Sequence, residues 1–205
     1  KPVIKSAWAG ARPLLKQNKL SEDSSRFVRE HEIEVLPAGL ISAMGGKWTT
    51  CRSIALDTLQ AVENYLGKSL PKPQAVSVIG TSSDPKTTTT LLLQQKVQLR
   101  ESLPESAFRE QQIEHLQSTY GLKALSIISQ NSLEELKPLS HVIPVCSAEF
   151  KHAIKFEHAL TSTDLLARRC RLAMVDINEA NRLLINASQY LEEAGLETEK
   201  INLEQ

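Results

Sequence analysis

The sequence has 205 residues, 41% of them hydrophobic, and its 24 lysines and arginines balance its 24 aspartates and glutamates, so the formal net charge is zero. This balance argues against a nucleic-acid-binding protein and against a polybasic membrane anchor. No apolar run approaches the roughly 20 residues that cross a bilayer, and no signal peptide is evident. The three cysteines are far apart and odd in number, which favours reduced thiols in a cytoplasmic protein. Because the sequence opens with Lys1-Pro2 and not with methionine, we expect it to begin inside a longer protein.

The N-terminal part alternates short apolar runs with polar segments. Residues 3–8 suit a strand, residues 30–35 suit an edge strand, and residues 40–43 have the length of one buried strand. A helical pattern follows and ends near Gly67. Two prolines and a loss of periodicity within residues 69–73 then predict a domain boundary.

Beyond this boundary the spacing of apolar residues is helical, with capping residues and glycine or proline stops between segments. We therefore predict a mainly α fold. Residues 1–68 are expected to form a β-β-α domain, and residues 69–205 an all-helical domain built as a bundle. The expected helices run from Pro85 to Leu99, from Pro104 to Tyr120, from Ala124 to Ser129, from Ser132 toward Lys137, from Glu149 to His158, from Asp164 to Ala173 and from Ala180 to Leu191.

The stretch from Gly39 to Arg52 holds the main candidate site. An apolar run is followed by Gly45 and Gly46, and then by a helix whose first turn carries the hydroxyl of Thr49. A glycine turn that opens a helix presents free backbone N–H groups to an anion. Lys47 adds a positive charge, so the stretch predicts an anion-facing site.

A nucleotide P-loop is the obvious competitor for this stretch, and the spacing excludes it. That motif needs a glycine five positions before Gly46 and a hydroxyl residue directly after the lysine. Ile41 and Trp48 stand at these two positions. The plain alternative is an ordinary strand-to-helix turn.

Two patterns in the helical part resemble metal sites and are rejected. Glu149-x-x-His152 has the spacing of one half of a di-metal helical site, but no second copy exists. Asp176-x-Asn178 begins like a calcium loop, but Asn181 replaces the required glycine. We expect no metal.

The remaining charged residues are expected to be structural. Arg168, Arg169 and Arg171 would point to different faces of a helix, and Glu149 and Glu157 lie on a neighbouring predicted helix. Partly buried Arg–Glu pairs are therefore favoured over an anion site. Four histidines have no ligand-like partner in the sequence and are expected at the surface or the core rim: His31, His115, His141 and His158.

Several separate motifs occur in a recognisable order along nearly the whole chain. They are Trp8-Ala-Gly-Ala-Arg-Pro-Leu14, Ser24-Ser-Arg26, Gly45-Gly-Lys-Trp-Thr-Thr50, Tyr120-Gly-Leu-Lys-Ala124, Ala148-Glu149, Glu157-His158-Ala159 and Asp164-Leu-Leu-Ala-Arg-Arg-Cys-Arg-Leu172. Their order resembles the C-terminal third of FAD-dependent glycerol-3-phosphate dehydrogenases, in the D-amino-acid-oxidase-like flavoprotein superfamily. One departure is Cys51, where relatives often carry an aromatic residue. The resemblance makes the β-β-α part a remnant of the FAD-dependent oxidase core.

This resemblance implies oxidation of sn-glycerol 3-phosphate to dihydroxyacetone phosphate, with hydride passing to FAD. It implies that Lys47 is the catalytic cation, because reduced flavin accumulates negative charge that a helix N-terminus and a lysine stabilise. It also implies that Arg12 and Arg26 hold the substrate phosphate. The residues expected to contact the cofactor are Gly45, Gly46, Lys47, Trp48 and Thr49.

The chain lacks a G-x-G-x-x-G dinucleotide fingerprint, so we expect it to be inactive by itself. The expected partners are glycerol 3-phosphate, a quinone or another electron acceptor, and a second copy in a homodimer, with no nucleic acid. The expected location is cytoplasmic, with peripheral contact to the inner face of the cytoplasmic membrane through parts outside this sequence. The alternative function is a non-catalytic helical interaction or oligomerisation domain.

Overall fold

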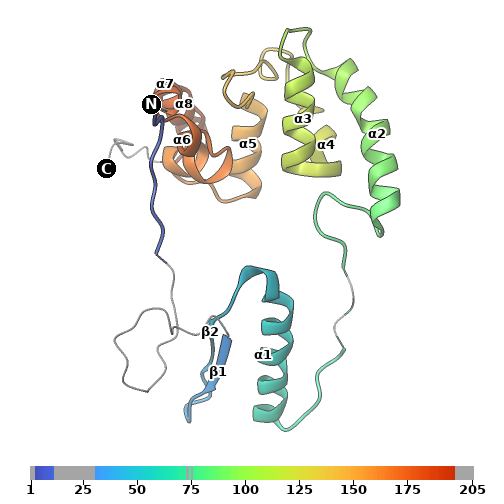
Figure 1. The fold of residues 1–205 in the computed structure, drawn as a ribbon, viewed down its shortest axis with the longest axis vertical. Coiled ribbons are helices and arrows are strands. Elements are labelled where there is room, and N and C mark those ends of the chain that lie inside the picture. Colours follow the sequence, from blue (N-terminus) through green and yellow to red (C-terminus); the bar gives the residue numbers. More distant parts are fainter. Residues whose placement is uncertain (1–2, 12–30, 73, 75, 197–205) are drawn as a thin grey trace. The chain divides into compact units, whose positions relative to one another are not determined.

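A computed structural model describes residues 3–11, 31–72, 74 and 76–196 of the chain. These residues form two compact units (Figure 1). One contains Lys1–Trp8 together with Val76–Gln205, and the other is Ala9–Ala75. Among the described residues, the strands form one two-stranded antiparallel sheet, and the other regular elements are helices. The predicted mainly α class is therefore confirmed.

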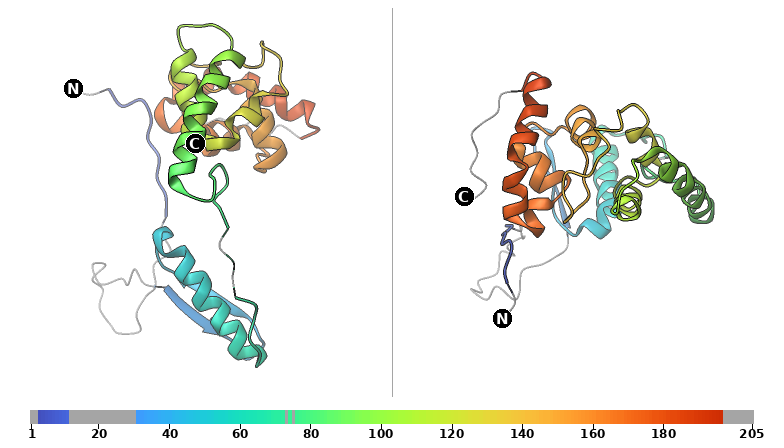
Figure 2. Two further views of the ribbon diagram at one scale, coloured as in Figure 1. Left: turned by 90° about the vertical axis from the view of Figure 1, so that its right-hand side faces the viewer. Right: turned by 90° about the horizontal axis from the view of Figure 1, so that it is seen from above.

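The Ala9–Ala75 unit is a small β-β-α arrangement. β1 (His31–Val35) pairs with β2 (Ile41–Gly45), with Ile33 opposite Ala43. A short 3₁₀ turn, η2 (Trp48–Thr50), leads into α1 (Cys51–Leu66), which lies along the two strands (Figures 1 and 2). Both strands lie within two residues of their predicted positions, and α1 ends at the predicted Gly67.

None of the described residues of this unit is buried. Several of its large apolar side chains are exposed, and Leu40 is 59% exposed and Leu66 48% exposed. The expectation of a buried strand at residues 40–43 is therefore wrong for this chain, since a two-stranded sheet and one helix enclose too little space for a core.

The helical unit contains most of the regular structure. Its elements are α2 (Pro85–Ser102), α3 (Arg109–Tyr120), η3 (Gly121–Lys123), α4 (Ala124–Ile128), α5 (Ser147–Phe156), the π-helix η4 (Asp164–Arg169), α6 (Leu172–Val175), α7 (Ile177–Arg182) and α8 (Leu184–Glu193). The start of α2 was predicted correctly. Asp84 caps this helix by accepting a hydrogen bond from the backbone N–H of Thr87 at 2.9 Å, and Pro85 occupies the first helical position.

Two hydrophobic clusters stabilise this unit, and α5 joins them. One cluster centres on α2, α3 and α4 and includes Leu99, Ile113 and Leu116. The other centres on α5 to α8 and includes Phe150 and Leu166. Figure 1 shows α5 between these two groups of helices. The side chains of α5 enter both clusters, so this helix determines how the two groups pack together.

Three predicted helices differ from the observed ones. Residues 103–108 precede α3 as turns and extended backbone, because Leu103 adopts extended geometry and inserts its side chain into the core at 3% exposure. Residues 132–137 form turns, since Pro138 cannot continue a helix and the Glu135 carboxylate folds back onto the N–H of Ser132 at 2.8 Å. The long helix expected over residues 180–191 is divided at Leu183.

The helix expected over residues 164–173 is also irregular. A cap is present at its start, because Thr161 and Asp164 exchange hydrogen bonds between side chain and backbone N–H at 3.1 Å. The chain then forms the π-helix η4, and Arg171 has a φ of 61° before α6 begins.

Residues 3–8 are not the predicted strand but an extended segment bound to the helical unit. The backbone carbonyl of Lys5 accepts a hydrogen bond from the N–H of Ile177 at 3.2 Å. The Lys5 amine donates to Asp176 at 2.9 Å, and the Ser6 hydroxyl donates to the carbonyl of Ala173 at 2.7 Å. The segment therefore attaches to the junction of α6 and α7.

No helix in the described part of the chain is long and apolar enough to cross a membrane.

Replacing Asp176 tests this attachment. The Asp176 side chain also caps α7, accepting from the N–H of Glu179 at 3.2 Å. We expect Asp176→Ala to lower the thermal midpoint by about 2–4 °C, because both the cap and the Lys5 contact are lost. Lys5→Met is the matched control, because it removes only the half-exposed ion pair and leaves the cap, and it should cost less than half as much. Equal shifts for the two variants would show that the cap contributes nothing.

The pH dependence of stability follows from Glu179, in the first turn of α7. Hydrogen bonds from Arg182 lower the pKa of this carboxyl from its ordinary 4.5 to about 2. A lowered folded-state pKa favours the ionised form, so this contribution is present above about pH 4.5 and is lost as the pH falls toward about 2. Glu179→Gln should therefore flatten the decline of urea midpoints across this window. The exposed Glu101→Gln is the control, and an unchanged decline in Glu179→Gln would contradict the assignment.

Candidate functional site

The predicted glycine turn lies between β2 and α1. Gly45 has a φ of 71° and Gly46 a φ of 83°, both in the left-handed region that side chains other than glycine rarely adopt. Lys47 returns to extended geometry, with φ −111° and ψ 150°. The two glycines thus reverse the chain directly after the strand and direct it into the helix.

The backbone at the start of the helix is open to solvent. All residues from 45 to 50 are exposed, and Trp48 is 89% exposed. No side chain caps the turn at Lys47 or the helix at Thr50. The hydroxyl and the N–H of Thr50 both donate to the carbonyl of Lys47, at 2.9 Å and 3.0 Å, and the N–H of Cys51 donates to the carbonyl of Trp48. The N–H groups left without a partner among the described residues are therefore those of residues 46–49. Uncapped N–H groups at a helix start are donors that an anion can accept from.

Lys47 has no ion-pair partner among the described residues. A free ammonium group beside uncapped N–H groups suits a negatively charged edge of a cofactor. The predicted cofactor contacts Gly45, Gly46, Lys47, Trp48 and Thr49 therefore form one continuous exposed segment. The predicted substrate residues Arg12 and Arg26 lie outside the described residues.

Gly46 packs against His31 of β1 and Ile54 of α1. A Cβ atom on Gly46 would lie 2.6 Å from Cδ1 of Ile54 and 3.2 Å from Cβ of His31, so Ile54 would have to move, and the φ of 83° itself favours glycine there. The His31 Nε2 atom lies 2.7 Å from Oδ2 of Asp57 in α1. His31 therefore has a partner that the sequence analysis missed. The two residues are 26 positions apart, and no spacing pattern connects them.

A second polar group lies inside the helical unit, around Glu149. This side chain is 2% exposed; its Oε1 lies 2.7 Å from Nε2 of His115, and its Oε2 accepts the N–H of Cys146 at 2.9 Å. Burial, followed by the charge of Glu149, raises the pKa of Tyr120 and also that of the Cys146 thiol. Both groups therefore stay protonated at neutral pH.

The Glu149 cluster is structural. The carboxylate is hydrogen-bonded to His115, whereas the sequence analysis left His115 without a partner and considered His152 beside Glu149. No group of three metal-ligating side chains occurs among the described residues. Cys146 stays a buried thiol, which makes it a weak nucleophile.

The arginines of η4 also have structural partners. Arg168 donates to Asp164 at 2.7 Å, and Arg169 donates through Nε to the carbonyl of Glu157 at 3.0 Å. The Arg169 guanidinium lies 3.8 Å from the Glu157 carboxylate, and both side chains are about one-third exposed or less. Arg169–Glu157 is thus the predicted kind of pair, whereas Glu149 has no arginine partner among the residues that the structure describes.

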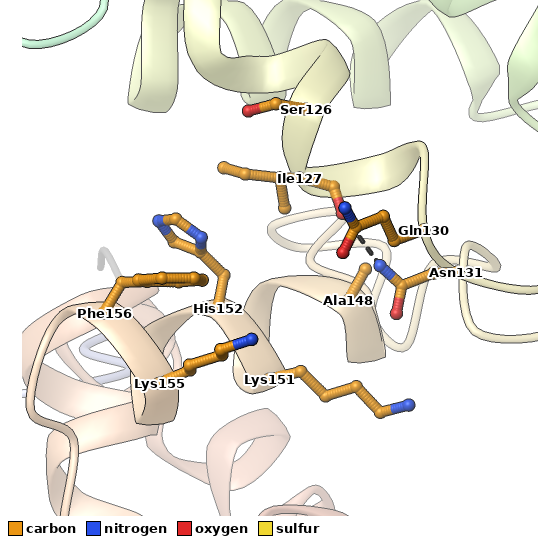
Figure 3. Close-up of a pocket in the computed structure, with 9 residues that line it drawn as sticks. All are labelled: Ser126, Ile127, Gln130, Asn131, Ala148, Lys151, His152, Lys155 and Phe156. Atoms are coloured by element: carbon orange, nitrogen blue, oxygen red, sulfur yellow. Dashed lines mark hydrogen bonds between the residues drawn. The ribbon is translucent and has the colours of Figure 1, made fainter.

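A pocket of about 240 Å³ lies between α4 and α5 (Figure 3). The ring of His152 lies 5.1 Å from that of Phe156, and burial lowers the pKa of this histidine. The Ser126 hydroxyl donates to the carbonyl of Lys123 and not to a base, so the pocket contains no nucleophile–base pair. Its lining residues are Ser126, Ile127, Gln130, Asn131, Ala148, Lys151, His152, Lys155 and Phe156.

The charges around this pocket are largely compensated. Lys151 forms an ion pair with Glu135, and its side chain extends away from His152 (Figure 3). The Lys155 amine lies 5.1 Å from the centre of the Phe156 ring. In the glycine turn the N–H groups of residues 46–49 and the Lys47 ammonium group have no partners among the described residues, so this turn is the stronger candidate site.

Comparison with known proteins identifies a family model and several relatives to which this chain is similar. A family model for the C-terminal domain of alpha-glycerophosphate oxidase matches residues 75–197. The mitochondrial glycerol-3-phosphate dehydrogenase of Homo sapiens is 31% identical over 212 residues, covering 95% of this chain and 28% of the human protein. That of Bos taurus is 32% identical over 192 residues, covering 88% and 24%. That of Arabidopsis thaliana is 30% identical over 197 residues, covering 92% and 31%. The chain thus spans about a quarter to a third of these relatives.

The structural role of Glu149 can be tested by its removal. We expect Glu149→Ala to lower the free energy of unfolding by about 2–4 kcal/mol, because His115 and the Cys146 N–H both lose a buried acceptor. Glu149→Gln should lose less, since its amide oxygen can still accept from Cys146. The readout is urea denaturation followed by circular dichroism. Glu134→Ala, which removes a carboxylate with 79% of its side chain exposed, is the control. A cost for Glu149→Ala as small as that of the control would contradict the assignment.

Proposed function

Since the chain belongs to the family of C-terminal domains of alpha-glycerophosphate oxidase, with glycerol-3-phosphate dehydrogenases as relatives, we propose that it is the C-terminal part of an FAD-dependent glycerol-3-phosphate dehydrogenase. The proposed reaction converts sn-glycerol 3-phosphate to dihydroxyacetone phosphate. When bound, FAD would supply the hydride acceptor. The residues that bind the adenine dinucleotide would belong to another part of the protein, because this sequence contains no G-x-G-x-x-G fingerprint.

The observation that carries this proposal is the exposed, uncapped turn at Gly45 and Gly46. A helix N-terminus stabilises negative charge through its free N–H groups, and Lys47 adds a full positive charge beside them. Reduced flavin is such an anion. In this assignment the turn acts as a fixed electrostatic complement to charge that appears during the reaction. Its glycines let the backbone approach the ligand closely.

The substrate phosphate is assigned to Arg12 and Arg26. A phosphate monoester carries about −2 charge at neutral pH, and guanidinium groups bind it through paired hydrogen bonds. This charge is the same before and after hydride transfer, so the two arginines would contribute mainly to binding. A quinone or another acceptor would then reoxidise the flavin.

A second candidate function is a helical interaction or oligomerisation domain. It is favoured by exposed apolar residues on α2, where Leu93 is 66% exposed and Val97, one turn later, is 55% exposed. This function does not require the glycine turn. Flavin retention by the 205-residue chain would support the flavin assignment, and concentration-dependent association without flavin would support the second candidate.

Two substitutions in the full-length protein separate the proposed roles. Lys47→Ala should slow flavin reduction by about 10²–10³-fold, as the loss of a donor to transition-state charge does. Arg12→Ala should raise the Michaelis constant, with a smaller effect on reduction at saturating substrate. Both are measured by stopped-flow flavin absorbance against substrate concentration. Lys68→Ala, an exposed lysine after α1, is the control.

Either assignment can fail separately. If Lys47→Ala reduces flavin at the wild-type rate, the electrostatic role assigned to the turn is wrong. If Arg12→Ala leaves the apparent substrate affinity unchanged, the assignment of the substrate phosphate to Arg12 is wrong.

A further inference from the structure

The His31–Asp57 pair connects β1 to α1, next to the glycine turn. His31 lies directly opposite Gly45 in the pairing of β1 with β2. Its ring nitrogen Nε2 lies 2.7 Å from the carboxylate of Asp57, in the second turn of α1. The strand and the helix that flank the turn are therefore joined by one short polar contact.

This contact is the one side-chain hydrogen bond between a strand and α1 among the described residues. The other side-chain bonds of the unit are local; examples are Thr58 to the carbonyl of Ile54 and Gln60 to Asn64. The described part of the unit also contains no buried residue. Without a core, the relation between β1 and α1 depends strongly on individual contacts of this kind.

The same histidine also contacts the turn. A Cβ on Gly46 would approach the Cβ of His31 to 3.2 Å, so the two residues are packed against each other. The His31 side chain is 25% exposed, whereas residues 45–50 are all exposed. His31 therefore supports the turn at Gly46 and is itself shielded from most of the solvent.

We propose that His31 and Asp57 are positioning residues for the turn formed by Gly45, Gly46 and Lys47. By fixing β1 to α1, they hold the uncapped N–H groups and the Lys47 backbone in one arrangement before an anion binds. Preorganised donors need no rearrangement when charge develops, which is why their geometry affects rates. The proposal rests on the flavin assignment for the identity of the anion, whereas the positioning itself can be measured without flavin.

A catalytic or metal role for the pair is not supported. Two ligands do not make a metal site, and no third ligating group joins them within the described residues. The pair contacts the turn through His31, which packs against Gly46. Its effect on a bound anion is therefore indirect, through the geometry of the turn.

The first test measures hydrogen exchange in the flavin-free 205-residue chain. His31→Leu and Asp57→Ala should each make the amides of Thr50 and Cys51, which donate to the carbonyls of Lys47 and Trp48, exchange about two- to fivefold faster, the range expected for a partly exposed polar pair. The double variant should be no worse than either single variant, because both remove the same contact. His31→Gln, which keeps a donor toward Asp57, should restore slow exchange.

The matched control is Gln60→Ala, which removes the side-chain bond to Asn64 at 3.3 Å on the same helix. It should leave the exchange of the Thr50 and Cys51 amides unchanged. Equal acceleration over all of α1 in His31→Leu would mean general destabilisation and would overturn positioning. Unchanged exchange of the Thr50 and Cys51 amides would overturn it as well.

The second test uses the full-length flavoprotein. His31→Leu should slow flavin reduction at saturating substrate by about three- to tenfold, with an unchanged Michaelis constant and rescue by His31→Gln. A raised Michaelis constant with an unchanged reduction rate would contradict positioning of the turn. If Lys47→Ala leaves reduction unchanged, the flavin assignment fails, and the exchange experiment still decides the positioning role.

Discussion

Glu149 places a carboxylate where two groups of helices meet, and at 2% exposure that carboxylate cannot rely on water. It is satisfied by His115 from α3 and by the N–H of Cys146 at the start of α5. A buried charge without such partners would be costly, so only arrangements that bring these groups together are favourable. Because α5 continues from this contact to Phe150 in the second cluster, one carboxylate relates both clusters to each other.

The Ala9–Ala75 unit is held together by different interactions from those of the helical unit. None of its described residues is buried, so its geometry depends on backbone pairing, on glycine conformations and on the contact of His31 with Asp57. Together these constraints determine the path of Gly45, Gly46 and Lys47. The exposed apolar side chains of the same unit, Leu40 among them, remain available for packing.

The polar residues of the helical unit stabilise the structure, whereas those of the glycine turn are the candidates for function. In the helical unit Arg168, Arg169 and Glu149 each satisfy a neighbouring group, and the pocket beside α5 has largely compensated charges. In the glycine turn the N–H groups of residues 46–49 and the Lys47 ammonium group have no partner among the described residues. Unsatisfied donors that are exposed cost little in the free protein and become valuable when an anion arrives. This contrast, more than any single motif, directs the functional assignment to the turn.

The sequence by itself determined the mainly α class, the two strands, the start of α2 at Pro85, the end of α1 at Gly67 and the glycine turn. All of these depend on residues within a few positions of one another, and such short-range patterns can be read directly. Only the tertiary structure decided the break at Leu183, the attachment of Lys5 to Asp176 and the partners of His31 and His115. The histidine partners lie 26 and 34 positions away and the Lys5 partner 171 positions away. Contacts over such separations arise from how the elements pack, and no local spacing encodes them.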